Sequence, residues 1–286
     1  MSDSSRTSAR LRTYAGFVKF EHTIFSLPLI YAGAVLAGRG WPSARLSLLM
    51  LGAAAGGRTV AMGLNRIIDR AIDARNPRTQ ARELPAGRMT LVEAWLVVLA
   101  ALAVYLGCAA AIAPMCVRWS PLPLALFVLY PYLKRFTALA HLGLGLAWAT
   151  APLGGWLAVR QSWSGLGEAL WLAAFSVLWV AGFDILYAMQ DVSVDVREKL
   201  HSLPAKLGAC RAAQIAKLLH TAAWLALVAL SAFALRPWIA APFLMAISGL
   251  LFWEHHTSDL ELAFFKINAA LGFVVLALVW AGVSVV

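Results

Sequence analysis

The sequence predicts an all-α fold whose helices cross a membrane several times. Apolar residues make up 61% of the 286-residue chain and charged residues only 13%, whereas a soluble domain carries about 25% charged residues. The apolar residues gather in long runs that are separated by short polar stretches. A helix of about 20 apolar residues spans the roughly 30 Å hydrocarbon core of a bilayer, so these runs predict a polytopic membrane protein.

Nine apolar runs of suitable length follow one another along the chain. They cover residues 22–38, 44–65, 91–113, 119–134, 139–159, 169–190, 212–234, 237–254 and 266–286. The fourth and eighth runs are short and contain proline, which weakens them as helices. Residues 1–19 are polar and basic and lack the apolar core of a secretory signal, so we expect them to be retained.

Basic residues fall mainly on one side of this layout. With the N-terminus in the cytoplasm, the other side holds only Arg39, Arg45, Arg118, Arg160 and Arg236. This asymmetry follows the positive-inside rule and predicts a cytoplasmic N-terminus. The net charge of +10 then reflects this bias and contact with anionic membrane lipids. A nucleic-acid partner is a poor alternative, because the basic residues lie in short loops between the runs.

Two pairs of aspartates occur at helical spacing. Asp69 and Asp73 follow Asn65 at the end of the second apolar run, and Asp191 and Asp195 end the sixth. Four residues of helix advance by about 400°, so the members of each pair share one face. Two carboxylate pairs that face one another would form an oxygen-rich site for a hard divalent cation. We therefore expect a metal-bound anion on the cytoplasmic side.

An ion-paired, solvated helix end is the alternative interpretation of either pair, since Arg66 and Arg70 are helical neighbours of the first. Two pairs on the same side of the membrane, in a chain with only 14 acidic residues, favour the metal site. A polar loop containing Leu-Pro-Ala follows each pair. This similarity between the two segments indicates a weak internal repeat within one domain, with halves near 20–135 and 139–286 and one site between them.

Arg58 and Asp184 lie inside apolar runs, where a charge is costly and needs a partner. Arg58 either pairs with an aspartate or binds the carboxylate of a substrate through a bidentate contact. Asp184 shares a helical face with Tyr187, Asp191 and Asp195. The position of Asp184 is equally compatible with pairing to Arg58 and with a direct role toward a substrate.

Basic side chains also lie near the first aspartate pair. Arg78 and Arg82 follow it in a polar loop, and Tyr130 and Lys134 end the fourth run. The arginines either clamp a diphosphate or anchor the loop at anionic lipid, and Lys134 either points at the same anion or only sets the orientation. Carboxylates that carry Mg²⁺ attract a diphosphate, because the metal bridges protein and phosphate oxygens.

The chemistry that fits these groups is ionisation of a diphosphate ester. A metal and arginines together neutralise the charge that builds on a leaving diphosphate. If the ester is allylic, its loss leaves a resonance-stabilised carbocation, which a dry cavity lined by aromatic side chains would shield from water. A long isoprenoid tail would also explain why the protein lies in a bilayer.

The two aspartate motifs together resemble the signature motifs of the UbiA-type intramembrane prenyltransferases. The resemblance extends along almost the whole chain and includes Lys19-Phe20-Glu21-His22-Thr23, Asp73-Ala74-Arg75-Asn76-Pro77-Arg78-Thr79, Leu84-Pro85-Ala86-Gly87, Tyr132-Leu133-Lys134-Arg135-Phe136-Thr137 and Phe264-Phe265-Lys266-Ile267-Asn268. It implies nine transmembrane helices around a central cavity, with a cytoplasmic cap. It also implies Mg²⁺ held through Asp69, Asp73, Asp191 and Asp195.

The same resemblance implies roles for the remaining polar residues. The diphosphate would be contacted by Asn65, Arg78, Arg82, Tyr130 and Lys134. The aromatic acceptor would lie near Arg58, Asp184 and Tyr187. The site would face the cytoplasm from a bacterial inner membrane.

The motif that opens at Lys19 and the loop after Asp73 resemble 4-hydroxybenzoate polyprenyltransferases of ubiquinone biosynthesis and the prenyltransferase of the futalosine route to menaquinone. The implied reaction transfers a polyprenyl group from polyprenyl diphosphate to an aromatic hydroxy acid by electrophilic substitution, and a base, for which Asp191 is one candidate, removes the ring proton. A naphthoate acceptor and a haem O synthase-like or chlorophyll-type enzyme are alternatives. A secondary transporter is an alternative of another class, but its acids should lie near mid-membrane on broken helices.

Overall fold

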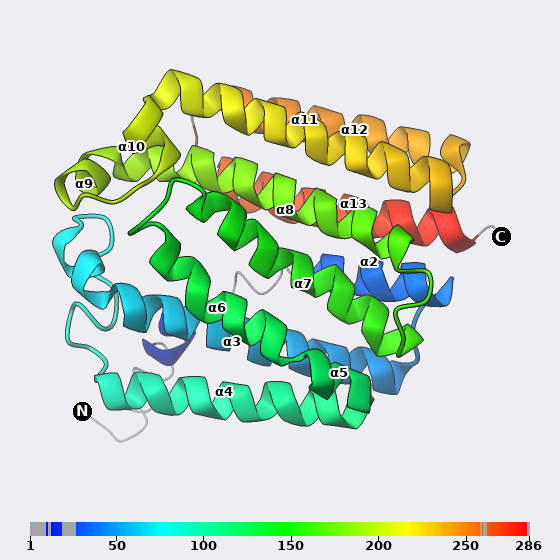
Figure 1. Cartoon of the computed structure of the whole chain (residues 1–286), viewed down its shortest axis with the longest axis horizontal. Coiled ribbons are helices and arrows are strands. Elements are labelled where there is room, and N and C mark those ends of the chain that lie inside the picture. Colours follow the sequence, from blue (N-terminus) through cyan, green and yellow to red (C-terminus); the bar gives the residue numbers. More distant parts are fainter. Residues whose placement is uncertain (1–9, 11–12, 19–26, 258, 260–261, 285–286) are drawn as a thin grey trace.

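The computed structural model describes residues 10, 13–18, 27–257, 259 and 262–284. Every regular element within them is helical (Figure 1), which confirms the all-α prediction. The longer helices are α2 (Leu27–Gly38), α3 (Ala44–Arg75), α4 (Leu91–Ile112), α6 (Pro121–Leu133), α7 (Ala140–Arg160), α8 (Leu166–Ala188), α11 (Ala209–Ala234), α12 (Pro237–His256) and α13 (Asn268–Ser284). Shorter elements join them: α5 (Pro114–Trp119), η2 (Met189–Asp191), α9 (Val192–Arg197), α10 (Leu203–Leu207) and the π-helical turn η3 (Leu262–Ile267).

Seven helices in the described ranges are long and apolar enough to cross a membrane: α3, α4, α7, α8, α11, α12 and the segment Phe265–Val283, which includes α13. The expected count of nine is therefore not confirmed. Helix α2 has 12 residues and α6 has 13, and residues 22–26 of the first expected run lie outside the described residues. The fourth expected run, 119–134, corresponds to α6, and a break at Ser120 separates it from α5, because Pro121 has no backbone N–H with which to continue α5.

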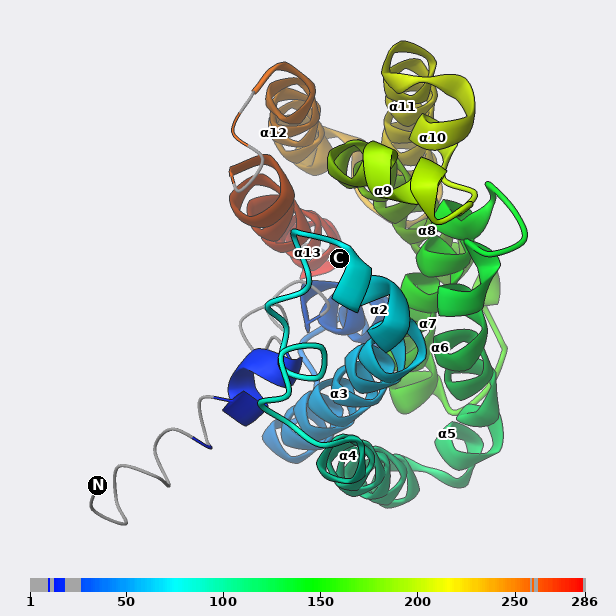
Figure 2. The same cartoon turned by 90° about the vertical axis from the view of Figure 1, so that its left-hand side faces the viewer.

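The long helices lie side by side, and their short connections gather at the ends of the bundle (Figure 1). In the end view, α3 and α4 lie on one side and α11 and α12 on the opposite side, with α6, α7 and α8 between them (Figure 2). Helix α2 packs against α7 and α13. Gly33 and Gly155 allow the close contact between α2 and α7. A Cβ added to Gly33 would lie 2.0 Å from Pro152 O, and a Cβ added to Gly155 would lie 1.9 Å from Ile30 O.

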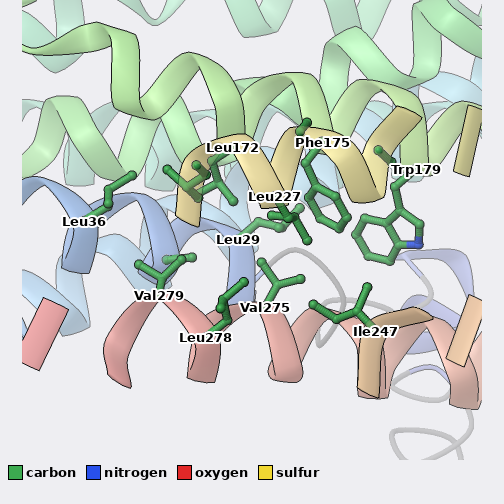
Figure 3. Close-up of a cluster of buried hydrophobic side chains, with 14 of the residues drawn as sticks. Leu29, Leu36, Leu172, Phe175, Trp179, Leu227, Ile247, Val275, Leu278 and Val279 are labelled. Carbon is green, nitrogen blue, oxygen red and sulfur yellow. The ribbon is translucent and has the colours of Figure 1, made fainter. Parts of the chain in front are cut away.

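The largest apolar core lies where α2, α7, α8, α11, α12 and α13 meet (Figure 3). Leu29, Trp179, Leu227, Ile247 and Val275 come from five of these helices, and all are fully buried. Between helices in a bilayer, such side chains stabilise the bundle through close van der Waals packing, because lipid tails are as apolar as the side chains. This core fixes α8, from which several of the expected site residues project.

Two features of the chain bring the expected motifs to one end of the bundle. Helix α3 has 32 residues, about 48 Å at 1.5 Å per residue, so its last turns extend beyond a bilayer core of roughly 30 Å. Those turns carry Asn65, Asp69 and Asp73. Helix α8 ends beside them, and α9, α10 and the loop 76–90 lie together at this end (Figure 1). We refer to it below as the α9 end.

Candidate active site

A cavity of about 1000 Å³ lies between the helices. Its wall includes residues of α3, α4, α6, α7 and α8, and most of its lining is apolar or aromatic. At the α9 end the lining is basic and polar, with Arg78, Arg82 and Asn65, whereas Trp119 and Trp163 line the opposite end. Seven of the expected substrate-binding residues line this cavity: Arg58, Asn65, Arg78, Arg82, Tyr130, Asp184 and Tyr187.

The first aspartate motif has the geometry that its spacing predicts. Asn65 donates from Nδ2 to Asp69 Oδ2 at 3.1 Å, as expected for side chains one helical turn apart. Asp69 is 2% exposed, and it accepts a hydrogen bond from Lys134 Nζ at 2.6 Å. Asp73 is also buried and accepts from Arg82 Nη1 at 2.8 Å. Both carboxylates are thus paired with cations that come from outside their own helix.

The expected alternative, an ion pair with helical neighbours, is wrong for this motif. Arg66 forms its salt bridge with Glu83, and Arg70 donates to the backbone oxygen of Ile67. Neither arginine forms a salt bridge with Asp69 or Asp73 within the described part of the chain. The cations that do so lie in the loop 76–90 and after α6, and helical periodicity alone gives no sign of them.

The second aspartate motif departs from the continuous helix that its spacing predicts. Helix α8 ends at Ala188, and Met189–Asp191 form a tighter 3₁₀ turn before α9 begins. The single face expected for Asp184, Tyr187, Asp191 and Asp195 is therefore interrupted. A 3₁₀ turn has about 3.0 residues per turn instead of 3.6, so it rotates the second motif relative to α8.

The two motifs meet through the residues that follow α3. Arg78 binds Asp191 with two nitrogens, including Nε to Oδ1 at 3.0 Å, and Asn76 Nδ2 donates to the same Oδ1 at 2.9 Å. Arg78 also donates to the hydroxyl of Tyr187 at 2.7 Å. Tyr187 therefore lies beside the basic loop, nearer the aspartates than its expected role at the acceptor suggests. Sequence reasoning missed Asn76, although its place three residues after Asp73 was a usable signal.

The oxygen donors at this end are of the type that Mg²⁺ prefers. No group of three or more acidic, histidine or cysteine side chains at metal-binding separation occurs among the described residues. Mg²⁺ sites that hold a phosphorylated substrate commonly use one or two carboxylates and take their other ligands from phosphates and water. Three of the four motif carboxylates, Asp69, Asp73 and Asp191, are paired with cations, and Asp195 is buried. Carboxylates split between two motifs in this way fit that kind of site better than a cage made by protein alone.

Arg58 lies deep in the bundle and reaches the cavity wall from α3. Its guanidinium lies 5.7 Å from the ring centroid of Trp148, and its Nε is buried without a hydrogen-bond partner. The expected alternative, a salt bridge to an aspartate, is absent among the described residues. Asp184 instead pairs with His141, at 2.7 Å between Oδ2 and Nδ1. Sequence reasoning missed His141, whose place in an apolar run was the available signal.

Together these features define a polytopic helical membrane protein with one large cavity and a cluster of paired acids and bases at its end. The chain belongs to the UbiA prenyltransferase family, whose model matches residues 26–268. This membership confirms the resemblance that the two motifs indicated, and the protein is an enzyme of the prenyltransferase class. A secondary transporter, the alternative of another class, is not supported.

Individual relatives agree with this assignment. The chain is 30% identical over 212 residues to a 4-hydroxybenzoate octaprenyltransferase of Vibrio cholerae serotype O1, covering 71% of this chain and 72% of that protein. Among solved structures it is similar to the apo structure of a UbiA homolog from Aeropyrum pernix K1, with 35% identity, a TM-score of 0.81, and coverage of 91% of this chain and 97% of that one. It also has the fold of a UbiA homolog from Archaeoglobus fulgidus bound to GPP and Mg²⁺, with 20% identity, a TM-score of 0.75, and coverage of 96% and 100%.

Proposed function

We propose that this protein transfers a polyprenyl group from polyprenyl diphosphate to an aromatic hydroxy acid such as 4-hydroxybenzoate, with Mg²⁺, in quinone biosynthesis. One observation carries the proposal. Basic residues at one end of an apolar cavity are paired with aspartates of both motifs, and the wall of the same cavity holds an arginine that has no carboxylate partner among the described residues. The two polar regions suit a diphosphate and a carboxylate, respectively, and the apolar lining suits an isoprenoid chain.

The α9 end would bind the diphosphate. Asp69, Asp73, Asp191 and Asp195, with Asn65, would hold Mg²⁺, which when bound supplies positive charge against the leaving diphosphate. Arg78, Arg82 and Lys134 would exchange their present aspartate partners for phosphate oxygens. Tyr130, which also lines the cavity, would donate its hydroxyl to the same anion. Charge-assisted contacts of this kind are strongest where water is excluded.

The acceptor would bind beside Arg58. The Nε of Arg58 is buried without a hydrogen-bond partner, which is costly, and a carboxylate that enters the cavity would relieve that cost through a bidentate contact. Trp148 lies against the guanidinium and would pack on the aromatic ring. The ring would then lie between Arg58 and the prenyl diphosphate, with Asp184 and Tyr187 in the same wall.

The reaction would proceed by substitution on the ring. The bond between the allylic carbon and the diphosphate oxygen breaks, and diphosphate leaves with the electron pair. A ring carbon activated by the hydroxyl then donates electrons to form the new carbon–carbon bond. The apolar, aromatic wall excludes water, which would otherwise capture the allylic cation.

Several features support the wider setting. Both expected halves of the chain line one cavity, which favours a single domain. The basic loop 76–90, α9 and α10 lie at the same end, which favours a cytoplasmic site in a bacterial inner membrane under the positive-inside rule. A naphthoate carboxylate would fit the same arginine. A haem O synthase-like reaction, with a bulky macrocycle, is the second acceptor class to test.

The experiment uses purified protein in lipid nanodiscs with geranyl diphosphate, Mg²⁺ and a panel of aromatic acids and macrocycles. We expect C-prenylated 4-hydroxybenzoate or a naphthoate, no product in EDTA, and recovery when Mg²⁺ is restored. Asp69→Ala and Asp191→Ala should abolish product while the protein stays folded, and the control Asp259→Asn, at an exposed position, should not. Product in EDTA, or turnover in either alanine variant, would refute the metal–diphosphate assignment.

A further inference from the structure

We propose that Asp184 is the base that accepts the ring proton, and that His141 is a positioning residue that holds its carboxylate toward the acceptor. The inference deepens the proposed function and rests on it. Prenyl transfer to an aromatic ring requires a proton acceptor inside a cavity that excludes water. Neither the motif spacing nor the family assignment identifies that group in this chain.

Asp184 occupies the position that such a base requires. It belongs to α8, lines the cavity, and has a side chain that is 27% exposed. Arg58 and Tyr130 line the same cavity. An acceptor held through its carboxylate by Arg58 would therefore have its ring within the region that Asp184 faces.

The hydrogen bonds of His141 define its tautomer. The backbone N–H of Leu203 donates to His141 Nε2 at 3.3 Å, and a backbone N–H can only donate. Nε2 must therefore accept, which leaves the proton of the neutral ring on Nδ1. That Nδ1–H donates to Asp184 Oδ2 at 2.7 Å. His141 is itself 4% exposed, so its ring is held firmly between α10 and α8.

This arrangement leaves Asp184 Oδ1 available. Within the described ranges, the bond from His141 is the side-chain hydrogen bond that Asp184 makes, and it occupies Oδ2. A neutral histidine orients the carboxylate without supplying the full charge of a lysine or arginine.

The other carboxylates near the cavity are less suitable. Glu83 also lines the cavity, but it is bound by Arg66 at 2.5 Å. Asp191, the residue that sequence reasoning offered as base, has both oxygens occupied by Arg78 and Asn76. It also belongs to the proposed diphosphate end. Asp184 is therefore the cavity carboxylate, among those described, that no arginine or lysine engages.

The proposed step balances without another reactant. After the carbon–carbon bond forms, the ring carbon that has been alkylated still carries its hydrogen. That proton moves to Asp184 Oδ1, and the electron pair of the C–H bond restores the aromatic ring. Asp184 then returns the proton to water or to the departing diphosphate as the products leave. His141 stays neutral throughout, with its Nδ1–H on Oδ2.

The test compares wild type with Asp184→Asn in nanodiscs with Mg²⁺ and geranyl diphosphate. The acceptor is 4-hydroxybenzoate with either hydrogen or deuterium at the ring positions beside the hydroxyl. We expect Asp184→Asn to slow C-prenylation by about 10²–10⁴-fold, the usual contribution of a general base, and to show a larger deuterium isotope effect than wild type. Diphosphate release without acceptor should persist, which shows that the variant is folded and still ionises its substrate.

His141 supplies a second, independent variant. In His141→Asn the amide nitrogen takes the place of Nδ1 and still donates to Asp184, so C-prenylation should stay near the wild-type rate. His141→Ala removes the donor and should slow C-prenylation and raise the isotope effect, with acceptor-independent diphosphate release retained. The control Asp259→Asn should match wild type in every measurement.

The outcomes distinguish the role of Asp184 as the base from the proposed prenyl-transfer function. Wild-type C-prenylation in Asp184→Asn, or an unchanged isotope effect, would refute Asp184 as the base and leave the proposed function in place. Parallel loss of prenylation and of acceptor-independent diphosphate release would place Asp184 in the diphosphate site and would also refute this role. Failure of wild type to prenylate any aromatic acid would remove the proposed function and, with it, the base.

Discussion

Replacing Arg58 with methionine should change stability and catalysis in opposite directions. In the protein without substrate, Arg58 has a buried Nε without a hydrogen-bond partner, and an unsatisfied buried polar group costs about 1–3 kcal/mol. The contact with Trp148, at 5.7 Å, returns about 0.5–2 kcal/mol. Methionine removes both terms and fills much of the same volume. The central values of the two ranges make the variant about 0.75 kcal/mol more stable than wild type, and their extremes run from about 1 kcal/mol less stable to about 2.5 kcal/mol more stable.

Catalysis should respond in the other direction. Loss of one partner of a buried, hydrogen-bonded charge pair costs about 2–5 kcal/mol. At about 1.4 kcal/mol for each factor of ten, this lowers kcat/KM for a carboxylate acceptor by roughly 30-fold to several thousand-fold. The KM for geranyl diphosphate should stay near the wild-type value. Methyl 4-hydroxybenzoate, which lacks the anionic carboxylate, should react equally with both proteins.

The assay measures thermal unfolding and acceptor kinetics on the same nanodisc samples. Arg45→Met is the matched control, because Arg45 is exposed at the start of the same helix α3, and it should leave kinetics unchanged. A lower Tm for Arg58→Met would show that the contact with Trp148 outweighs the cost of the buried Nε. An equal loss of activity toward the acid and its methyl ester would refute carboxylate recognition.

Two further predictions concern packing. Gly155→Ala should lower the free energy of unfolding by at least about 1–3 kcal/mol, because its Cβ would lie 1.9 Å from Ile30 O. In the control Gly154→Ala, the added Cβ meets nothing within 4 Å, so the stability should not change. Thermal unfolding measures both variants. Asn268→Leu should destabilise the bundle by about 1–3 kcal/mol, because the buried Trp179 Nε1–H now donates to Asn268 at 2.7 Å; an unchanged Tm would contradict this.

The sequence was most informative where function depends on local spacing. The separation of Asn65, Asp69 and Asp73 predicted one helical face, and the Asn65–Asp69 hydrogen bond has that geometry. Hydropathy predicted the all-α membrane class, since a bilayer requires long apolar helices. It did not predict the short helix α5 between the third and fourth runs, because six residues are too few to give a signal in an average over a window.

Contacts between distant segments could not be predicted from the sequence. The pairing of Asp184 with His141 joins α8 to α7, and the pairing of Asp191 with Asn76 joins two segments that are 115 residues apart. Helical periodicity identifies which residues share a face but not what the face meets. The interruption of α8 at Met189–Asp191 also has no clear mark in composition, since the residues around it are compatible with a regular helix.

The central claim is that the early and late aspartates act on one metal–diphosphate group. A double-mutant cycle of Asp69→Asn and Asp191→Asn tests it by calorimetry, with Mg²⁺ and an unreactive geranyl thiodiphosphate as the titrant. Each single variant should weaken Mg²⁺-dependent binding by about 1.5–3 kcal/mol, and the double variant should lose at least about 0.5 kcal/mol less than the sum. Effects that add fully, or a variant of either motif that binds as tightly as wild type, would contradict the claim.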